Sequence, residues 1–139
     1  MNAKQIDNIK TIVLFTAIII MIIFALHITY EKYMRDTMLT DGKILCNQIM
    51  NAQMSYYSEN KKFMTLNKVS YVEEFPLDAR NNPYFSVFST FQSGGKQEIT
   101  VFGSEEMEGY EIHLEFDNTT NKLRSIKKLK MNVIKTKNK

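Results

Sequence analysis

The strongest constraint on the fold is an apolar run near the N-terminus, residues 11–30, which reads TIVLFTAIIIMIIFALHITY. It contains no Asp, Glu, Lys or Arg, and isoleucine is its commonest residue. As a helix, about 20 residues rise about 30 Å, which is the thickness of the hydrocarbon core of a bilayer. The roughly 100 residues that follow are too few to surround a helix that is apolar on every side. The run therefore predicts a transmembrane helix.

The apolar run is longer than that of a secretory signal peptide, which is about 7–15 residues. The residues after it, HITYEKYMRD, hold no small-x-small cleavage pattern. We therefore expect an uncleaved anchor, with residues 1–10 as an N-terminal flank. The flanking charges lean slightly against a cytoplasmic position of this flank, because Lys4 and Lys10 precede the run whereas Lys32, Arg35 and Lys43 follow it.

His27 is a polar residue inside the run, and a polar residue in a membrane is a functional hypothesis by default. It lies three residues before the end of the run, less than one helical turn, and has no acidic partner within it. We expect a neutral histidine near the headgroups or in a helix contact, with an intramembrane functional site as the alternative.

A second helical segment is expected over residues 31–60, which contain no proline. Its apolar residues recur on one helical face, as an amphipathic helix requires. This face, the helix stripe, consists of Met34, Met38, Leu45, Ile49, Ala52 and Tyr56. Gly42 is the weak point, because a glycine inside a helix costs about 1 kcal/mol relative to alanine and Thr40-Asp41 could cap a new helix. A continuous helix and a break within residues 40–42 both stay open.

The C-terminal half changes to the two-residue period of strands. We expect strands at residues 84–91, 98–102, 110–116 and 123–133, a connecting loop over residues 61–82, and a frayed basic tail over residues 135–139. Short connections favour an antiparallel meander, and the helix stripe is the natural cover for one of its faces. A coiled coil with a second copy is the weaker alternative, because the stripe keeps no clean heptad. The predicted fold class is α+β, a long N-terminal helix packed on a four-stranded antiparallel sheet, with residues 31–134 as the domain.

Acidic and basic residues are separated along the last third of the chain. Residues 105–117 hold six acidic residues and no Lys or Arg, and residues 122–139 hold eight basic residues and no acidic one. In a hairpin we expect Glu111 and Glu115 to face Arg124 and Lys128. The alternative is a contact of the basic segment with another subunit or with anionic headgroups.

Groups that carry catalysis or hold cofactors are scarce in this sequence. One cysteine and two distant histidines exclude an intramolecular disulfide and a cysteine-rich zinc site, and Cys46 is expected to be a small apolar packing residue. There is no phosphate loop, HExxH, GxSxG or calcium-loop pattern. We expect a protein that is not an enzyme, with no catalytic, cofactor-binding or metal-binding residue and no cofactor. The net charge of +3 is too small to indicate nucleic-acid binding.

Residues 52–63, AQMSYYSENKKF, resemble the end of the long helix in the type IV pilin and pseudopilin family. That family has an alanine-rich turn, two tyrosines and then Glu-Asn-Gly-Lys-Tyr; Lys61 and Phe63 stand here in place of its Gly and Tyr. Residues 82–85, NPYF, are similar to the family's entry into its first strand. Two family features are missing. No glycine precedes Gly42 to form a prepilin-peptidase site, and no acidic residue lies between Asp7 and Glu31 to register subunits in a filament.

The resemblance implies a single-pass protein of the bacterial inner membrane, with its N-terminus in the cytoplasm and its domain outside. It implies a structural or assembly component of a type IV pilus or a type II secretion machine. The implied partners are the lipid bilayer and pilin-like or secretion-system subunits, through the anchor helix and the helix stripe. The alternative is an extracytoplasmic module that binds a ligand or partner in an aromatic pocket, although a core position is commoner for such a set. The aromatic set is Tyr84, Phe85, Phe88, Phe91 and Phe102.

Overall fold

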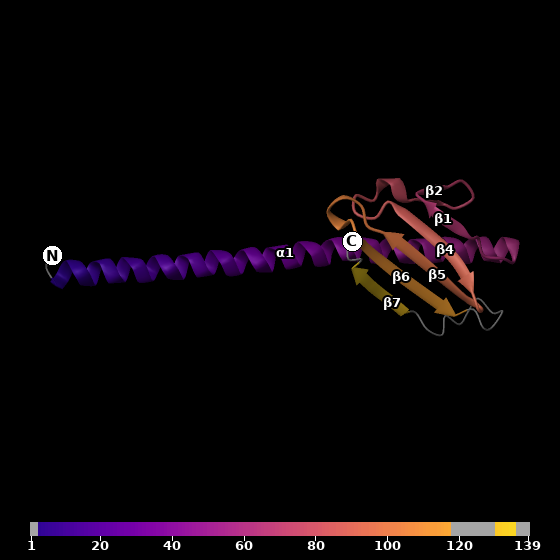
Figure 1. Ribbon diagram of the computed structural model, residues 1–139. Coiled ribbons are helices and arrows are strands. Elements are labelled where there is room, and N and C mark those ends of the chain that lie inside the picture. Colours follow the sequence, from indigo (N-terminus) through magenta and orange to yellow (C-terminus); the bar gives the residue numbers. More distant parts are fainter. Residues whose placement is uncertain (1–2, 118–129, 136–139) are drawn as a thin grey trace. The chain divides into compact units, whose positions relative to one another are not determined.

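The computed structural model describes residues 3–117 and 130–135. It divides into two compact units, Met1–Thr37 and Met38–Lys139. Helix α1 (Ala3–Asn60) supplies the first unit and the first element of the second (Figure 1). The second unit is an α+β domain in which the rest of α1 packs on an antiparallel sheet.

The sheet of this domain has five strands in the order β1-β4-β5-β6-β7, and all neighbours are antiparallel. A separate two-stranded ribbon pairs β2 with β3, and two short 3₁₀ helices, η1 and η2, lie in the connections. The bounds are β1 (Leu66–Val69), β2 (Tyr71–Val72), β3 (Leu77–Asp78), η1 (Ala79–Asn81), β4 (Val87–Ser93), β5 (Lys96–Phe102), η2 (Glu105–Met107), β6 (Tyr110–Asp117) and β7 (Lys130–Lys135).

The predicted α+β class is confirmed, but the predicted number of strands is wrong. Residues 61–82 are not one loop, because they contain β1, β2, β3 and η1. The sequence of strand β1 shows no two-residue alternation. In the structure, its pairing with β4 is irregular between Leu66 and Val69, and Lys68 has a positive φ of 48°. A four-residue strand with such a distortion leaves no periodic signal.

The limits of the other strands also differ from the expected ones. Strand β4 begins at Val87 rather than at residue 84, because the Asn82 side-chain oxygen accepts hydrogen bonds from the N–H groups of Tyr84 and Phe85 and holds them in a turn. Strand β5 begins at Lys96, and the two-residue turn before it holds Gly94 and Gly95 at φ of 57° and 81°. Positive φ at both positions is what a tight hairpin turn requires.

The last expected strand, residues 123–133, is described only from residue 130. Residues 130–133 lie in β7, which continues to Lys135. Lys135 therefore belongs to a strand and not to the expected tail. The remaining residues of that strand, including Arg124 and Lys128, and residues 136–139 of the tail lie outside the described residues.

The core forms where the helix stripe meets one face of the sheet. Leu45, Ile49 and Ala52 of the stripe are buried, as is Met38, whereas Met34 and Tyr56 are half-buried. The sheet contributes Phe88, Ile99, Val101, Ile112 and Leu114, and the turn before β4 contributes Phe85; none of these side chains exposes measurable surface. Full burial of such a side chain contributes about 1.5–3 kcal/mol. The part of the predicted stripe from Met38 to Ala52 is therefore the face that holds the helix on the sheet.

Gly42 lies inside a continuous helix, so the open question of a break is settled in favour of continuity. A Cβ atom at this position would lie 2.5 Å from Cδ1 of Ile112 and 2.8 Å from the ring of Phe85. These distances are shorter than van der Waals contact. The glycine therefore allows the helix to approach the sheet closely, and this contact compensates its low helix propensity.

A buried hydrogen-bond network joins the end of α1 to two strands. The Gln53 amide nitrogen donates to the carbonyl of Met64 (2.7 Å) and to the hydroxyl of Thr90 (2.9 Å), and its oxygen accepts from the Met64 N–H (3.0 Å). The Thr90 hydroxyl donates to the Met64 carbonyl and accepts from the N–H of Leu66. Because Gln53 and Thr90 are buried, these bonds specify one position of the helix end over β1 and β4.

Candidate functional site

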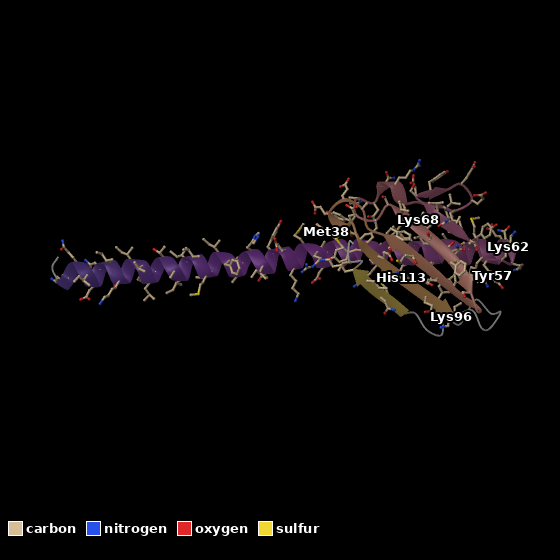
Figure 2. All side chains as sticks on the ribbon, in the orientation of Figure 1. Met38, Tyr57, Lys62, Lys68, Lys96 and His113 are labelled. Carbon is tan, nitrogen blue, oxygen red and sulfur yellow. The ribbon has the colours of Figure 1, made fainter. Side chains whose placement is uncertain are left out.

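The first candidate site is the apolar part of α1 in the first unit. One helix of the described residues is long and apolar enough to cross a membrane, and none of its apolar window is buried. Large side chains project from every side of it (Figure 2), and those that are exposed include Ile12, Leu14, Phe15, Ile19, Ile22, Phe24 and Leu26. The core helix of a soluble protein is mostly buried, so this part of α1 is not a core helix. Its surface fits a hydrocarbon environment.

The polar groups within the apolar run are locally satisfied. The hydroxyls of Thr16 and Thr29 each donate to the carbonyl four residues earlier, at 2.9 Å. His27 Nε2 lies 3.3 Å from Glu31 Oε1. No acidic partner of His27 lies within the run itself, but Glu31 is the first residue after it. The four-residue spacing between the two residues is the sequence signal for this pair.

The aromatic set does not line a common pocket, so that part of the alternative prediction is wrong. Phe85 and Phe88 are fully buried in the core. Phe91 is 56% exposed on the other face of the sheet, where Phe102 lies under the Lys68 ammonium at 5.2 Å. The two-residue period of strands places Phe88 on one face and Phe91 and Phe102 on the other. Phe85 and the half-buried Tyr84 lie in the turn before β4.

The outer face of the sheet carries a polar cluster around His113. Its Nδ1 lies 2.9 Å from Glu98 Oε1 and 3.0 Å from the Thr100 hydroxyl, and its Nε2 lies 3.2 Å from Glu111 Oε2 (Figure 2). No group of three or more His, Cys, Asp or Glu side chains in the described residues is arranged to hold a metal ion. The cluster joins His113 to Glu111 within β6 and to Glu98 and Thr100 across on β5, on a solvated sheet face.

The acidic strand β6 is matched by basic residues from both sides. Glu115 forms an ion pair with Lys96 of β5, and the register of β7 places Lys130 opposite Glu115. Ile134 lies opposite Glu111. The specific pairs expected with Arg124 and Lys128 fall outside the described residues.

Cys46 is a core residue, as predicted. Its side chain is fully buried and its sulfur lies 3.8 Å from the carbonyl oxygen of Ile112. Burial raises the pKa of the Cys46 thiol to about 12. A buried thiol that stays protonated at neutral pH is not a nucleophile.

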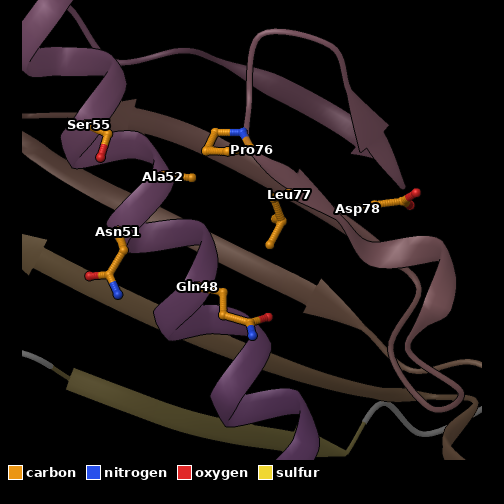
Figure 3. A pocket seen from close by; sticks show the side chains of 7 residues that line it. All are labelled: Gln48, Asn51, Ala52, Ser55, Pro76, Leu77 and Asp78. Carbon is orange, nitrogen blue, oxygen red and sulfur yellow. The ribbon is translucent and has the colours of Figure 1, made fainter.

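A groove of about 460 Å³ lies between α1 and the β2–β3 ribbon of the second unit (Figure 3). The helix contributes three polar side chains, Gln48, Asn51 and Ser55, together with Ala52. The other wall consists of Pro76, Leu77 and Asp78. This site was not predicted from the sequence, because its two walls are distant in sequence and the second wall falls in the segment expected to be a loop.

These features define a class of protein: a candidate N-terminal membrane-spanning helix joined to an α+β domain. A long apolar N-terminal helix that packs on an antiparallel sheet is a pilin-like layout. No protein-family model, curated protein or solved structure matches the chain.

Proposed function

We propose that the chain is a membrane-anchored, pilin-like structural or assembly component of a bacterial envelope machine of the type IV pilus or type II secretion kind. The anchor helix is its working surface in the bilayer, and the α+β domain is the part that other subunits contact outside the cytoplasm. Its partners are lipid and other pilin-like or secretion-system subunits, not nucleic acid.

The observation that carries this proposal is the change in environment along α1. The apolar window has no buried side chain, whereas Leu45, Ile49 and Ala52 of the same helix are buried against a sheet. A helix of this kind has one part suited to lipid and another suited to a protein core. The resemblance of residues 52–63 to the end of a pilin helix supports the same function.

The anchor has properties that suit lateral contacts between helices. Its threonine hydroxyls are bonded to its own backbone, so they need no partner in the bilayer. Its faces are dominated by isoleucine, which offers shape and van der Waals contact rather than the close approach of small residues. We place the N-terminus in the cytoplasm and the domain outside.

The proposed role is structural and requires no catalysis. The single thiol of the chain, Cys46, is buried and protonated, which supports a packing role.

Two measurements in the native host test the proposal. The mass of the protein extracted from membranes should correspond to an intact N-terminus; loss of the first ten or so residues indicates processing, and loss of the run through Tyr30 contradicts the anchor.

A photo-crosslinking residue at Ile19 should then yield a product with another single-pass, pilin-like subunit. A crosslink at Asn47, on the exposed side of α1 in the domain, serves as the comparison. If Ile19 crosslinks only to lipid, the assembly role is wrong although the anchor stands.

A further inference from the structure

The groove between α1 and the β2–β3 ribbon has one wall built for hydrogen bonding. Among the described residues, the side chains of Gln48, Asn51 and Ser55 make no hydrogen bond within the chain. They follow one another at three- and four-residue steps, so they lie on one face of the helix and span about 10 Å along its axis. About three residues of an extended chain cover the same length.

The opposite wall is a strand edge that pairs with no further strand in the part of the chain that the structure describes. In the ribbon, Tyr71 pairs with Asp78, and the Ala79 N–H donates to the Ser70 carbonyl at 2.9 Å. Because antiparallel pairs alternate between bonded and non-bonded, this bond makes Tyr71–Asp78 a non-bonded pair. The backbone N–H and C=O of Asp78 therefore point away from β2. Residues of β3 line the groove and residues of β2 do not, so the groove lies on the side of this free edge.

The charge of the groove favours an uncharged ligand. Among the described residues that line it, Asp78 alone is ionisable. The side-chain hydrogen bonds and the charge of Arg80 hold the pKa of this carboxyl below its usual range, and the guanidinium neutralises it. The rest of the lining consists of carboxamides, a hydroxyl and the apolar side chains of Ala52, Pro76 and Leu77, which lie between the helix and the ribbon in Figure 3.

We propose that this groove binds an extended, uncharged polypeptide segment of a partner protein, which adds to the β2–β3 ribbon as a third strand along β3. On one side, the backbone of the segment pairs with the backbone of Asp78. On the other side, the segment exchanges hydrogen bonds with the side chains of Gln48, Asn51 and Ser55. A small apolar side chain of the segment packs on Pro76 and Leu77. Strand addition is a common mode of peptide recognition, and a two-stranded ribbon gains stability from a third strand.

This inference does not depend on the role of the anchor, because both walls belong to the second unit. It also differs from a glycan site, which commonly offers an aromatic platform: none of the groove-lining residues is aromatic.

Selection of peptides tests the proposal directly. The full chain in nanodiscs of phosphatidylethanolamine and phosphatidylglycerol is panned with a library of random dodecapeptides displayed on phage, and the enriched peptide is labelled for fluorescence anisotropy. Ser55→Trp, an exposed helix position that lines the groove, should weaken binding by about tenfold or more because the indole fills the site. Asn47→Trp is the matched control, since it is exposed on the same helix but does not line the groove. It should leave the affinity within about twofold.

The second measurement separates strand addition from other binding. N-methylation of alternate backbone amides of the peptide removes its donors and should weaken binding by about tenfold. Circular dichroism establishes that both tryptophan variants are folded. The proposal is overturned if no peptide is enriched, if Ser55→Trp and Asn47→Trp bind alike, or if N-methylation has no effect. Binding of chitohexaose in competition with the peptide would reassign the groove to a neutral glycan.

Discussion

The two parts of helix α1 differ in composition and in the angular pattern of their apolar side chains. In the first unit, isoleucine, leucine and phenylalanine point in every direction and remain exposed; in the second unit, apolar residues form one stripe that is buried on the sheet. Helix formation is common to both parts, so it does not reveal the environment of either. The angular distribution of apolar side chains does, because a stripe fits a core on one side and water on the other, whereas an all-round apolar surface fits lipid.

The variant with the largest expected effect places charge at the centre of the apolar run. Ile19→Lys combined with Ile23→Lys should cost about 6 kcal/mol of insertion free energy, because each lysine at the centre of a membrane helix costs about 3 kcal/mol. The fraction of the double variant that stays in the membrane during alkaline carbonate extraction should fall sharply. Asn47→Lys, on the exposed face of the second part, should leave it unchanged. Equal extraction of the double variant and the unchanged chain would show that the run does not reside in lipid.

The next test removes the same atoms from each part of the helix. Ile49→Ala should lower the free energy of unfolding of the domain by about 2–5 kcal/mol, because Ile49 is completely buried. Ile19→Ala, in the exposed apolar part, should change it by less than about 0.5 kcal/mol. Urea unfolding in detergent, followed by the near-ultraviolet circular dichroism of the tyrosines, measures both. Comparable losses for the two variants would mean that the first part also packs in the protein core.

A third test uses pH to probe the buried side of the helix. The pKa of Cys46 rises from 9.0 to about 12 on burial. Above pH 9 the unfolded chain therefore loses the thiol proton while the folded chain keeps it, and stability falls with rising pH until about pH 12. At pH 11 the expected loss is about 3 kcal/mol, and the contribution is fully present below pH 9.

The reference for this experiment is Cys46→Ala, because tyrosines and lysines titrate in the same range. The stability of the unchanged chain relative to Cys46→Ala should decline between pH 9 and pH 11. Parallel curves for the two proteins would show that the thiol ionises as readily in the folded state as in the unfolded one.

The smallest effect concerns the closest contact between helix and sheet. Gly42→Ala gains about 1 kcal/mol of helix propensity but introduces a Cβ that overlaps Ile112 and Phe85, at about 1–3 kcal/mol for overpacking. We expect a net destabilisation of about 1 kcal/mol in the same urea assay. Lys43→Ala, at the exposed neighbouring position, should be nearly neutral. A stabilised Gly42→Ala variant would mean that the helix and the sheet are not as close as described.

The predictions that held are those with a strong periodic signal. The stripe from Met38 to Ala52 follows the helical period, and β6 follows strict two-residue alternation. Strands β1, β2 and β3 are two to four residues long, which is too short to show a period, so they were assigned to a loop. The polar groove was not predicted because neither Gln48 nor Leu77 belongs to a sequence pattern that indicates a binding site.

The sequence by itself determined the features that depend on local composition: an apolar run long enough for a bilayer, an amphipathic helix after it and a set of alternating strands. Only the tertiary structure decided the features that depend on contacts between distant segments. These include the close approach at Gly42, the buried bonds of Gln53 with Thr90, the fifth strand and the groove. The physical reason is that hydrophobic periodicity is written in neighbouring residues, whereas close packing, hydrogen-bond satisfaction and edge pairing arise only when segments far apart in the chain meet.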